Sequence, residues 1–167
     1  KNKKVLVVGL GFSGGGVGVA KFLAQNGAHL TIADKKSKQE LRDSIAELKK
    51  YKNIRYIYGG YSSHIDNFDF IVLNPAVDPR SPFVKKIKKE GISIESELGL
   101  FLKYCRGKVI AITGTKGKGT TATLVYKIFK KAGKDVVLGG NIGVSLLEKL
   151  PRIKKNTFVV LEVSSFQ

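Results

Sequence analysis

A glycine-rich segment with two lysines, "TGTKGKGTT" (113–121), has the composition of a phosphate-binding loop. In such loops backbone N–H groups hold phosphate oxygens, and a lysine reaches the β and γ phosphates of a nucleotide. Lys118 would be that lysine, and Lys116 adds positive charge. A P-loop has Ser or Thr directly after its lysine, and that hydroxyl binds Mg²⁺. Here Gly119 follows Lys118 and the hydroxyl of Thr120 comes one place later. The pattern predicts an ATP loop with an altered metal contact; a lysine-rich turn is the alternative.

A second glycine pattern, "GLGFSG" (9–14), has the G-x-G-x-x-G spacing, and Asp34 stands 20 residues after Gly14. Between a strand and a helix this pattern binds a pyrophosphate at the helix N-terminus, while the acid binds a ribose. We therefore expect Asp34 to lie at the mouth of this loop. A nucleotide-sugar diphosphate presents the same pyrophosphate as NAD, so an NAD(P)-dependent oxidoreductase or a nucleotide-sensing module stays open. A purely structural turn is the third possibility.

Two further polar residues follow or end apolar runs. Asn141 lies in "GGNIG" (139–143), directly after a predicted strand, and Glu162 lies in the apolar run "TFVVLEV" (157–163). Ligand sites of α/β proteins lie at the carboxyl ends of strands. A carboxylate in a buried strand is costly unless it is paired or binds a metal. Glu162 is therefore a candidate metal ligand, with a structural ion pair as the alternative.

Short β-branched runs alternate with amphipathic segments along the chain, which is typical of parallel βαβ units. Strands are expected at 4–9, 29–34, 54–59, 69–74, 92–96, 108–113, 135–140 and 157–163. Helices are expected at about 15–26, after the capping box 37–40, after Ser81-Pro82, and at 98–104, 118–132 and 143–149. We expect an α/β protein: a Rossmann-like parallel-sheet domain (1–104), then the start of a P-loop NTPase-type α/β domain (105–167). The strand at 108–113 is expected to be buried.

The composition excludes several classes of protein. The 167 residues carry 30 basic and 13 acidic side chains, a net charge of +17, but the lysines are scattered, which favours a solvated surface over a nucleic-acid partner. No apolar run approaches the ~18 residues of a membrane span, so membrane insertion is not expected. The single Cys105 excludes an internal disulfide and fits a reducing cytoplasm. Without a methionine, and with an apolar strand near its end, the chain is expected to be part of a longer protein.

Taken in order, the motifs "GLGFSG", "TGTKGKGTT", "GGNIG" and "LEVSSFQ" resemble those of the Mur ligases of peptidoglycan synthesis, over essentially the whole chain. Within that family the resemblance is greatest to the ligases that join D-glutamate to UDP-N-acetylmuramoyl-L-alanine. It implies a cytoplasmic, monomeric enzyme of three domains that uses ATP and Mg²⁺. ATP converts the substrate carboxylate to an acyl phosphate, which the D-glutamate amine attacks. This chain would hold the first domain and part of the second, and would be inactive alone.

The resemblance also implies roles for individual residues. The catalytic residues would be Lys118 and Glu162, and metal binding would fall to Glu162 and Thr120. ATP would be bound by Gly114, Thr115, Lys116, Gly117, Lys118, Gly119, Thr120 and Asn141. The UDP-substrate would be bound by Gly11, Phe12, Ser13, Asp34, Lys35, Lys36, Asn74, Pro75, Ala76, Asn141, Ser164 and Gln167. Gly119 departs from the family pattern, and its missing hydroxyl is expected to weaken metal binding.

Overall fold

The chain divides into two compact units, Lys1–Glu97 and Leu98–Gln167. A computed structural model describes residues 2–11, 15–61, 64–140 and 145–164. The helix α4 (Glu97–Tyr104) falls almost wholly in the second unit. The sequence interpretation grouped this helix with the first unit and placed the boundary after it.

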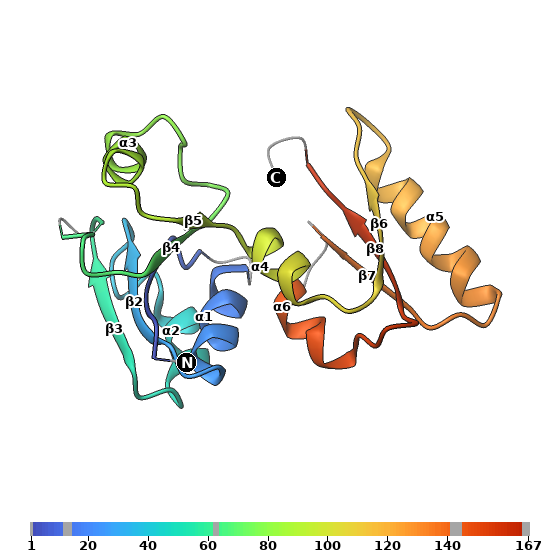
Figure 1. Cartoon of the computed structure of the whole chain (residues 1–167), viewed down its shortest axis with the longest axis horizontal. Helices are drawn as coiled ribbons and strands as arrows, with labels where there is room; N and C mark the ends of the chain where they lie inside the picture. The colour runs from blue at the N-terminus through green and yellow to red at the C-terminus, as the bar shows by residue number, and fades with distance from the viewer. Residues whose placement is uncertain (1, 12–14, 62–63, 141–144, 165–167) are drawn as a thin grey trace. The chain divides into compact units, whose positions relative to one another are not determined.

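The first unit contains a five-stranded sheet in which all strands are parallel (Figure 1). Its strands are β1 (Lys4–Val8), β2 (His29–Asp34), β3 (Ile54–Tyr58), β4 (Phe70–Leu73) and β5 (Ile94–Glu95), in the order β3-β2-β1-β4-β5. From β1 the chain adds β2 and β3 on one side of the sheet and then returns to add β4 and β5 on the other side, so the strand order switches between β1 and β4. In such sheets a ligand crevice forms at the carboxyl ends of the strands on either side of that switch. The predicted Rossmann-like α/β fold is confirmed.

The central strand β1 is buried because helices pack on both faces of the sheet there. The helix α1 (Gly15–Gln25) contacts β1, β2 and α2 (Arg42–Leu48). On the other face α3 (Pro82–Lys89) contributes Val84 and Ile87 to a cluster with Leu6, Val8 and Ile71. Four consecutive residues of β1 are buried, as expected for a strand that is covered on both sides.

Two predicted helix starts have different outcomes. Ser81 accepts a hydrogen bond from the Val84 N–H (3.4 Å) and Pro82 is the first helical residue, so the predicted start of α3 is confirmed. The capping-box hydrogen bonds between Ser37 and Glu40 also form: the Glu40 Oε2 accepts from the Ser37 N–H and from the Ser37 hydroxyl, each at 2.8 Å. The α-helix that they were expected to open begins only at Arg42. The hydrogen bonds between Ser37 and Glu40 stabilise a turn, and the helix begins directly after Leu41, whose side chain is buried in the core.

The second unit contains a three-stranded parallel sheet in the order β6-β8-β7. Its elements are β6 (Lys108–Ile112), α5 (Lys118–Lys131), β7 (Val136–Gly140), α6 (Leu146–Lys149), a 3₁₀ turn (Leu150–Arg152) and β8 (Phe158–Glu162). The central strand β8 is buried, and Ala122 of α5 packs on Val136 and Val160. The prediction of a buried strand at 108–113 is wrong, since β6 is at the sheet edge and Val109 is 39% exposed. An apolar run does not distinguish an edge strand from a central one.

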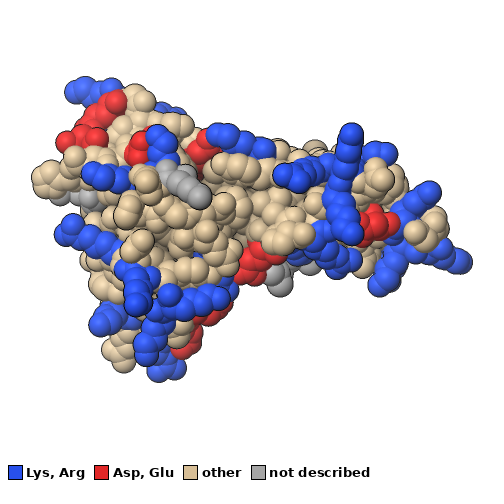
Figure 2. Space-filling view, turned by 60° about the horizontal axis from the view of Figure 1, so that its bottom comes forward, with Lys and Arg blue, Asp and Glu red and all other residues tan. Residues whose placement is uncertain are grey.

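Basic side chains are distributed around the surface. Figure 2 shows Lys and Arg spread over the face in view, with Asp and Glu between them. Within the described ranges, no helix has both the length and the apolar character needed to cross a membrane.

Candidate functional site

Asp34 closes the glycine loop of the first unit. As the spacing predicted, this last residue of β2 lies at the mouth of the loop that follows β1. Its Oδ2 accepts hydrogen bonds from the N–H groups of Leu10 (2.8 Å) and Gly11 (3.3 Å), and its Oδ1 accepts one from Lys36 N–H (3.0 Å). The side chain is buried, so these charge-assisted bonds are little screened by water. The carboxylate that the fingerprint would assign to a ribose thus braces the loop and the start of the Lys36 segment.

Two side chains from other elements hold the same loop. Asn74, at the end of β4, donates from Nδ2 to the Gly9 carbonyl (3.2 Å) and accepts from the Ala76 N–H (3.0 Å). Ser44 of α2 donates to the Gly11 carbonyl (3.0 Å). Gly9 has φ +86°, and a Cβ there would lie 2.8 Å from the Asn74 Cβ. Residues 9–11 therefore form a platform that side chains from β2, from α2 and from the end of β4 hold in place.

Ser44 was missed by the sequence interpretation. It is a buried polar residue on the inward face of α2, beside Leu48. A serine among apolar positions of an amphipathic helix is the only sequence signal of this role. That signal is weak, because serines also occur on such faces without a specific partner.

Exposed and partly exposed groups lie around this platform. Lys35 and the residues Pro75 and Ala76 are exposed, and Lys36 is partly exposed. The Lys35 ammonium lies over the Tyr61 ring, 5.3 Å from its centroid. Burial, and then the negative charge of Asp34, raise the pKa of Tyr61. Phe12 and Ser13 lie outside the described residues.

The predicted phosphate loop joins β6 to α5 in the second unit. Gly114 (φ +149°) and Gly117 (φ +75°) adopt backbone conformations that favour glycine, and Gly117 is the N-cap residue of α5. The Lys118 ammonium folds back over the loop and donates to the Gly114 carbonyl (2.9 Å). Gly114, Thr115, Lys116 and Gly117 are exposed. The unpaired N–H groups of the first helical turn and a lysine ammonium are thus concentrated at one exposed place, which suits an anion.

Glu162 lies beside the first turn of α5. As the last residue of the central strand β8, it is in register with Ile112 of β6 and Gly140 of β7. A Cβ added at Gly119 would lie 3.5 Å from the Glu162 Oε2, an ordinary contact distance. A Cβ at Gly140 would lie 2.0 Å from the Glu162 carbonyl oxygen, so the backbones of β7 and β8 are in very close contact there. Position 119 therefore faces the carboxylate, and a small side chain would fit between them.

The remaining predicted residues are less engaged. Within the described ranges Glu162 makes no ion pair, so the structural alternative weighed from the sequence has no partner there. Thr120 is exposed, one residue beyond Gly119 and thus rotated by about 100° around the helix axis. Ser164 is partly exposed, whereas Asn141 and Gln167 lie outside the described residues. Among the described side chains no group of three or more His, Cys, Asp or Glu gathers as a metal site.

Comparison with protein families gives two adjacent matches. Residues 3–96 match the family "Mur ligase MurD-like, N-terminal domain", and residues 112–167 match "Mur ligase middle domain". The two matched segments fall on the two halves of the chain that carry the glycine loop and the phosphate loop.

Individual relatives match over the whole chain. The chain is 44% identical over 99% of its length to the UDP-N-acetylmuramoylalanine--D-glutamate ligase of Clostridium tetani, and spans 36% of that protein. It is 41% identical over 98% of its length to the protein of the same name from Roseiflexus sp., of which it spans 35%. The chain thus spans about a third of the length of these curated relatives.

A solved structure has the same fold. The UDP-N-acetylmuramate:L-alanyl-gamma-D-glutamyl-meso-diaminopimelate ligase of Neisseria meningitides aligns with a TM-score of 0.56 over 97% of this chain and 52% of that one. At 21% sequence identity this likeness shows the fold alone.

Proposed function

The chain belongs to the Mur ligase family, and we propose that it is part of an ATP-dependent ligase that joins D-glutamate to UDP-N-acetylmuramoyl-L-alanine in peptidoglycan synthesis. One observation carries this proposal above others: the phosphate-loop lysine Lys118 and the Glu162 carboxylate, which forms no ion pair with any described residue, both lie at the first turn of α5. They do so in the segment that matches the family's middle domain, in a chain whose relatives are named D-glutamate ligases.

The proposed ATP site consists of the loop from Gly114 to Thr120, and the family resemblance adds Asn141 to it. The fit to a nucleotide rests on the exposed loop glycines and on Lys118, whose ammonium donates to the Gly114 carbonyl, a partner that phosphate oxygens can replace. Backbone N–H groups at the start of α5 would hold the β and γ phosphates, and Lys116 would add positive charge. Neutralising these phosphate charges is the contribution that Lys118 makes to catalysis.

The proposed Mg²⁺ site includes Glu162, with Thr120 as a second candidate ligand. Mg²⁺ keeps several waters and binds through one or two carboxylates together with substrate phosphates. A single carboxylate facing the helix start fits this requirement, as does the lack of a larger acidic cluster among the described residues. Because Gly119 offers no hydroxyl, we expect the metal to be held more weakly than in a loop with Ser at that position.

The proposed UDP-substrate site lies at the carboxyl ends of β1, β2 and β4. Asp34 and Asn74 would act by holding the loop in shape, since their polar atoms bond its backbone. Lys35 and Lys36 would supply charge for the diphosphate, and Pro75 and Ala76 would flank the base. Gly11, Phe12 and Ser13 belong to the loop itself. The family resemblance also assigns Ser164 and Gln167 to binding of the UDP-substrate.

The reaction needs activation because a carboxylate is a poor acyl donor. When bound, ATP supplies a phosphoryl group that turns the alanine carboxylate into an acyl phosphate with a good leaving group. The residues of this chain bind and orient the two anionic reactants and offset their mutual repulsion. We further propose that the protein acts as a monomer in the cytoplasm. A reducing compartment of this kind agrees with the free thiol of Cys105.

An NAD(P) site in the first unit is the alternative. The dinucleotide fingerprint assigns the acid after the second strand to a ribose. Here both oxygens of the Asp34 carboxylate accept from backbone N–H groups instead, and the second phosphate loop at Gly114–Thr120 also counts against this alternative.

Calorimetric titration of the chain tests these assignments. We expect UDP-N-acetylmuramoyl-L-alanine to bind and NAD not to bind. Mg·ATP should bind, and Lys118→Ala should weaken it at least tenfold, whereas Lys127→Ala, an exposed lysine further along α5, should not. Binding of NAD with no binding of the UDP-substrate would overturn the ligase proposal in favour of the alternative.

An activity measurement tests the proposed dependence on further domains. We expect the chain alone to release no phosphate in the presence of ATP, UDP-N-acetylmuramoyl-L-alanine and D-glutamate, and a full-length version to do so. Phosphate release by the chain alone that requires both substrates would contradict this expectation.

A further inference from the structure

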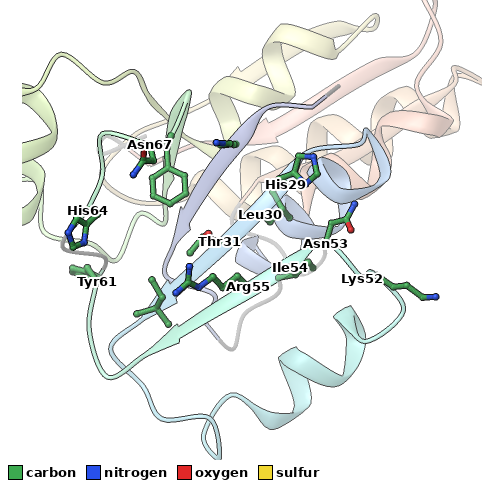
Figure 3. Close-up of a pocket in the computed structure, with 13 residues that line it drawn as sticks. His29, Leu30, Thr31, Lys52, Asn53, Ile54, Arg55, Tyr61, His64 and Asn67 are labelled. Atoms are coloured by element: carbon green, nitrogen blue, oxygen red, sulfur yellow. The ribbon is translucent and has the colours of Figure 1, made fainter.

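A hollow of about 860 Å³ lies on one face of the sheet in the first unit (Figure 3). It exists because β3 and β4 are joined by residues 59–69, and the described part of this connection contains no helix to cover the sheet. Buried Ile65 anchors the connection in the core. The hollow is lined by strand residues such as Thr31 and Ile57 and by Tyr61 and Phe68 of the connection.

The lining of the hollow is positively charged. Five residues that can carry positive charge line it, and no Asp or Glu does: these are Lys4, His29, Lys52, Arg55 and His64. Arg55 and Thr31 lie beside each other in the middle of the hollow, whereas Lys52 extends from its rim (Figure 3). In the part of the chain that the structure describes, the side chains of Lys52 and Arg55 pair with no carboxylate, whereas Lys4 lies near the Asp69 carboxylate. A guanidinium that has no carboxylate partner and lies on a concave surface is suited to bind an anion through two parallel N–H···O hydrogen bonds, that is, as a bidentate donor.

The lining also contains rings and hydrogen-bonding groups. Tyr61 is held in place by Phe83, with ring centroids 4.7 Å apart, and Phe68 adds a second ring to the lining. Asn53, Asn67 and Thr31 offer donors and acceptors. Small-molecule sites measure about 300–1,000 Å³ and combine aromatic walls with a few polar groups. The hollow has this size and this chemistry.

We propose that the hollow binds a small organic phosphate that carries an aromatic base, of the class of nucleoside monophosphates. Arg55 and the surrounding cations receive the phosphate, and the rings of Tyr61 and Phe68 contact the base. The proposal does not depend on the ligase function. Asp34 does not line the hollow, and it follows Thr31 by three residues along β2, which is about 10 Å. The hollow is thus distinct from the glycine loop but adjoins it through Tyr61, which lines the hollow and lies under the Lys35 ammonium, so a bound ligand can influence the loop.

Titration of the isotope-labelled chain with AMP, followed by amide chemical shifts, tests the proposal. We expect AMP to shift the amide signals of Thr31 and Arg55 and to bind at least ten times more tightly than adenosine or inorganic phosphate alone. Arg55→Gln should weaken AMP binding at least tenfold. The matched control is Arg42→Gln, an exposed arginine on α2 that should change binding less than twofold. Lys52→Gln, at the rim, should weaken it two- to threefold.

Three outcomes would overturn the proposal. The first is AMP-induced shifts confined to the glycine loop at Leu10 and Gly11, which would assign AMP to the substrate site. The second is equal weakening by Arg55→Gln and Arg42→Gln, which would show binding through net charge only. The third is binding of phosphate as tight as that of AMP, which would remove any role for the base. Far-UV circular dichroism of each variant separates loss of binding from loss of folding, and Lys52→Gln keeps the test decisive if Arg55→Gln does not fold.

Discussion

Replacing Asp34 with asparagine removes a negative charge from the glycine loop while keeping the size and shape of the side chain. The carboxylate accepts three backbone hydrogen bonds, from Leu10 and Gly11 at one oxygen and from Lys36 at the other. In Asp34→Asn one of these oxygens becomes an NH₂ group, which cannot accept. If the remaining oxygen stays on the loop, the NH₂ group faces the Lys36 N–H, and two donors oppose each other.

The expected cost can be worked out from these bonds. A hydrogen bond to a charged group contributes about 1.5–3 kcal/mol, roughly twice a neutral one. Asp34→Asn loses one such bond and converts two others to neutral bonds, so the unfolding free energy of the first unit should fall by at least about 3 kcal/mol. The side chain is 7% exposed, and water cannot replace the lost partners without opening the loop. With a urea m-value of about 1–3 kcal/mol/M, the midpoint should fall by about 1–3 M.

Urea unfolding followed by tyrosine fluorescence measures this effect, because Tyr51, Tyr56, Tyr58 and Tyr61 all belong to the first unit. Amide hydrogen exchange at Leu10 and Lys36 should accelerate in parallel. Asp43→Asn is the matched control: its side chain is 93% exposed, and we expect a change within about 0.5 kcal/mol. If Asp34→Asn stays as stable as Asp43→Asn, the carboxylate does not brace the loop, and its assignment to a ligand hydroxyl becomes the better one.

Three further outcomes are expected. In a full-length version, Gly119→Ser should strengthen Mg·ATP binding several-fold, because position 119 faces Glu162, while Thr120→Ala should change the affinity less than twofold. Calorimetry measures both affinities. A larger loss of affinity in Thr120→Ala would show that Thr120, and not position 119, is on the metal side of the loop. Gly140→Ala should destabilise the second unit by about 3 kcal/mol in thermal unfolding, because the added Cβ would overlap the β8 backbone. The control Gly133→Ala, also at positive φ but in open space, should cost only about 1 kcal/mol. Equal costs would contradict the close contact of β7 and β8. Ser81→Ala should lower stability by about 1 kcal/mol through loss of the α3 cap, and an unchanged urea midpoint would argue against that cap.

Much of the fold follows from local pattern. Alternating apolar strands and amphipathic helices were sufficient to predict the two parallel sheets, because each element needs one or two buried faces wherever it lies in the chain. Helix ends that depend on neighbouring residues, such as Ser81 before Pro82 and Gly133 after α5, were also predictable. The glycine motifs could be assigned to strand–helix turns for the same reason, since only glycine adopts these backbone conformations at low cost.

Strand order and burial could not be predicted in this way. The apolar run of β6 looks like that of β8, yet β6 is at the edge and β8 is central, because hydrogen-bond pairing between distant segments decides the position. The start of α2 was misplaced for a related reason. The capping box between Ser37 and Glu40 is a local preference, while the helix itself begins where tertiary packing buries Leu41.

The sequence by itself determined which residues could do chemistry. These are Lys118 among the glycines of the phosphate loop, Asp34 at the end of the strand that follows the first glycine loop, and Glu162 at the end of an apolar strand. The tertiary structure alone decided what those groups contact. Asp34 turned to the N–H groups of the neighbouring loop, and Glu162 came beside Gly119, which is 43 positions earlier in the chain. The hollow around Arg55 has no sequence motif at all, because its residues come from strands and a connection that only folding brings together. The physical reason is that spacing along the chain limits only near neighbours, whereas burial and strand pairing determine which distant side chains meet.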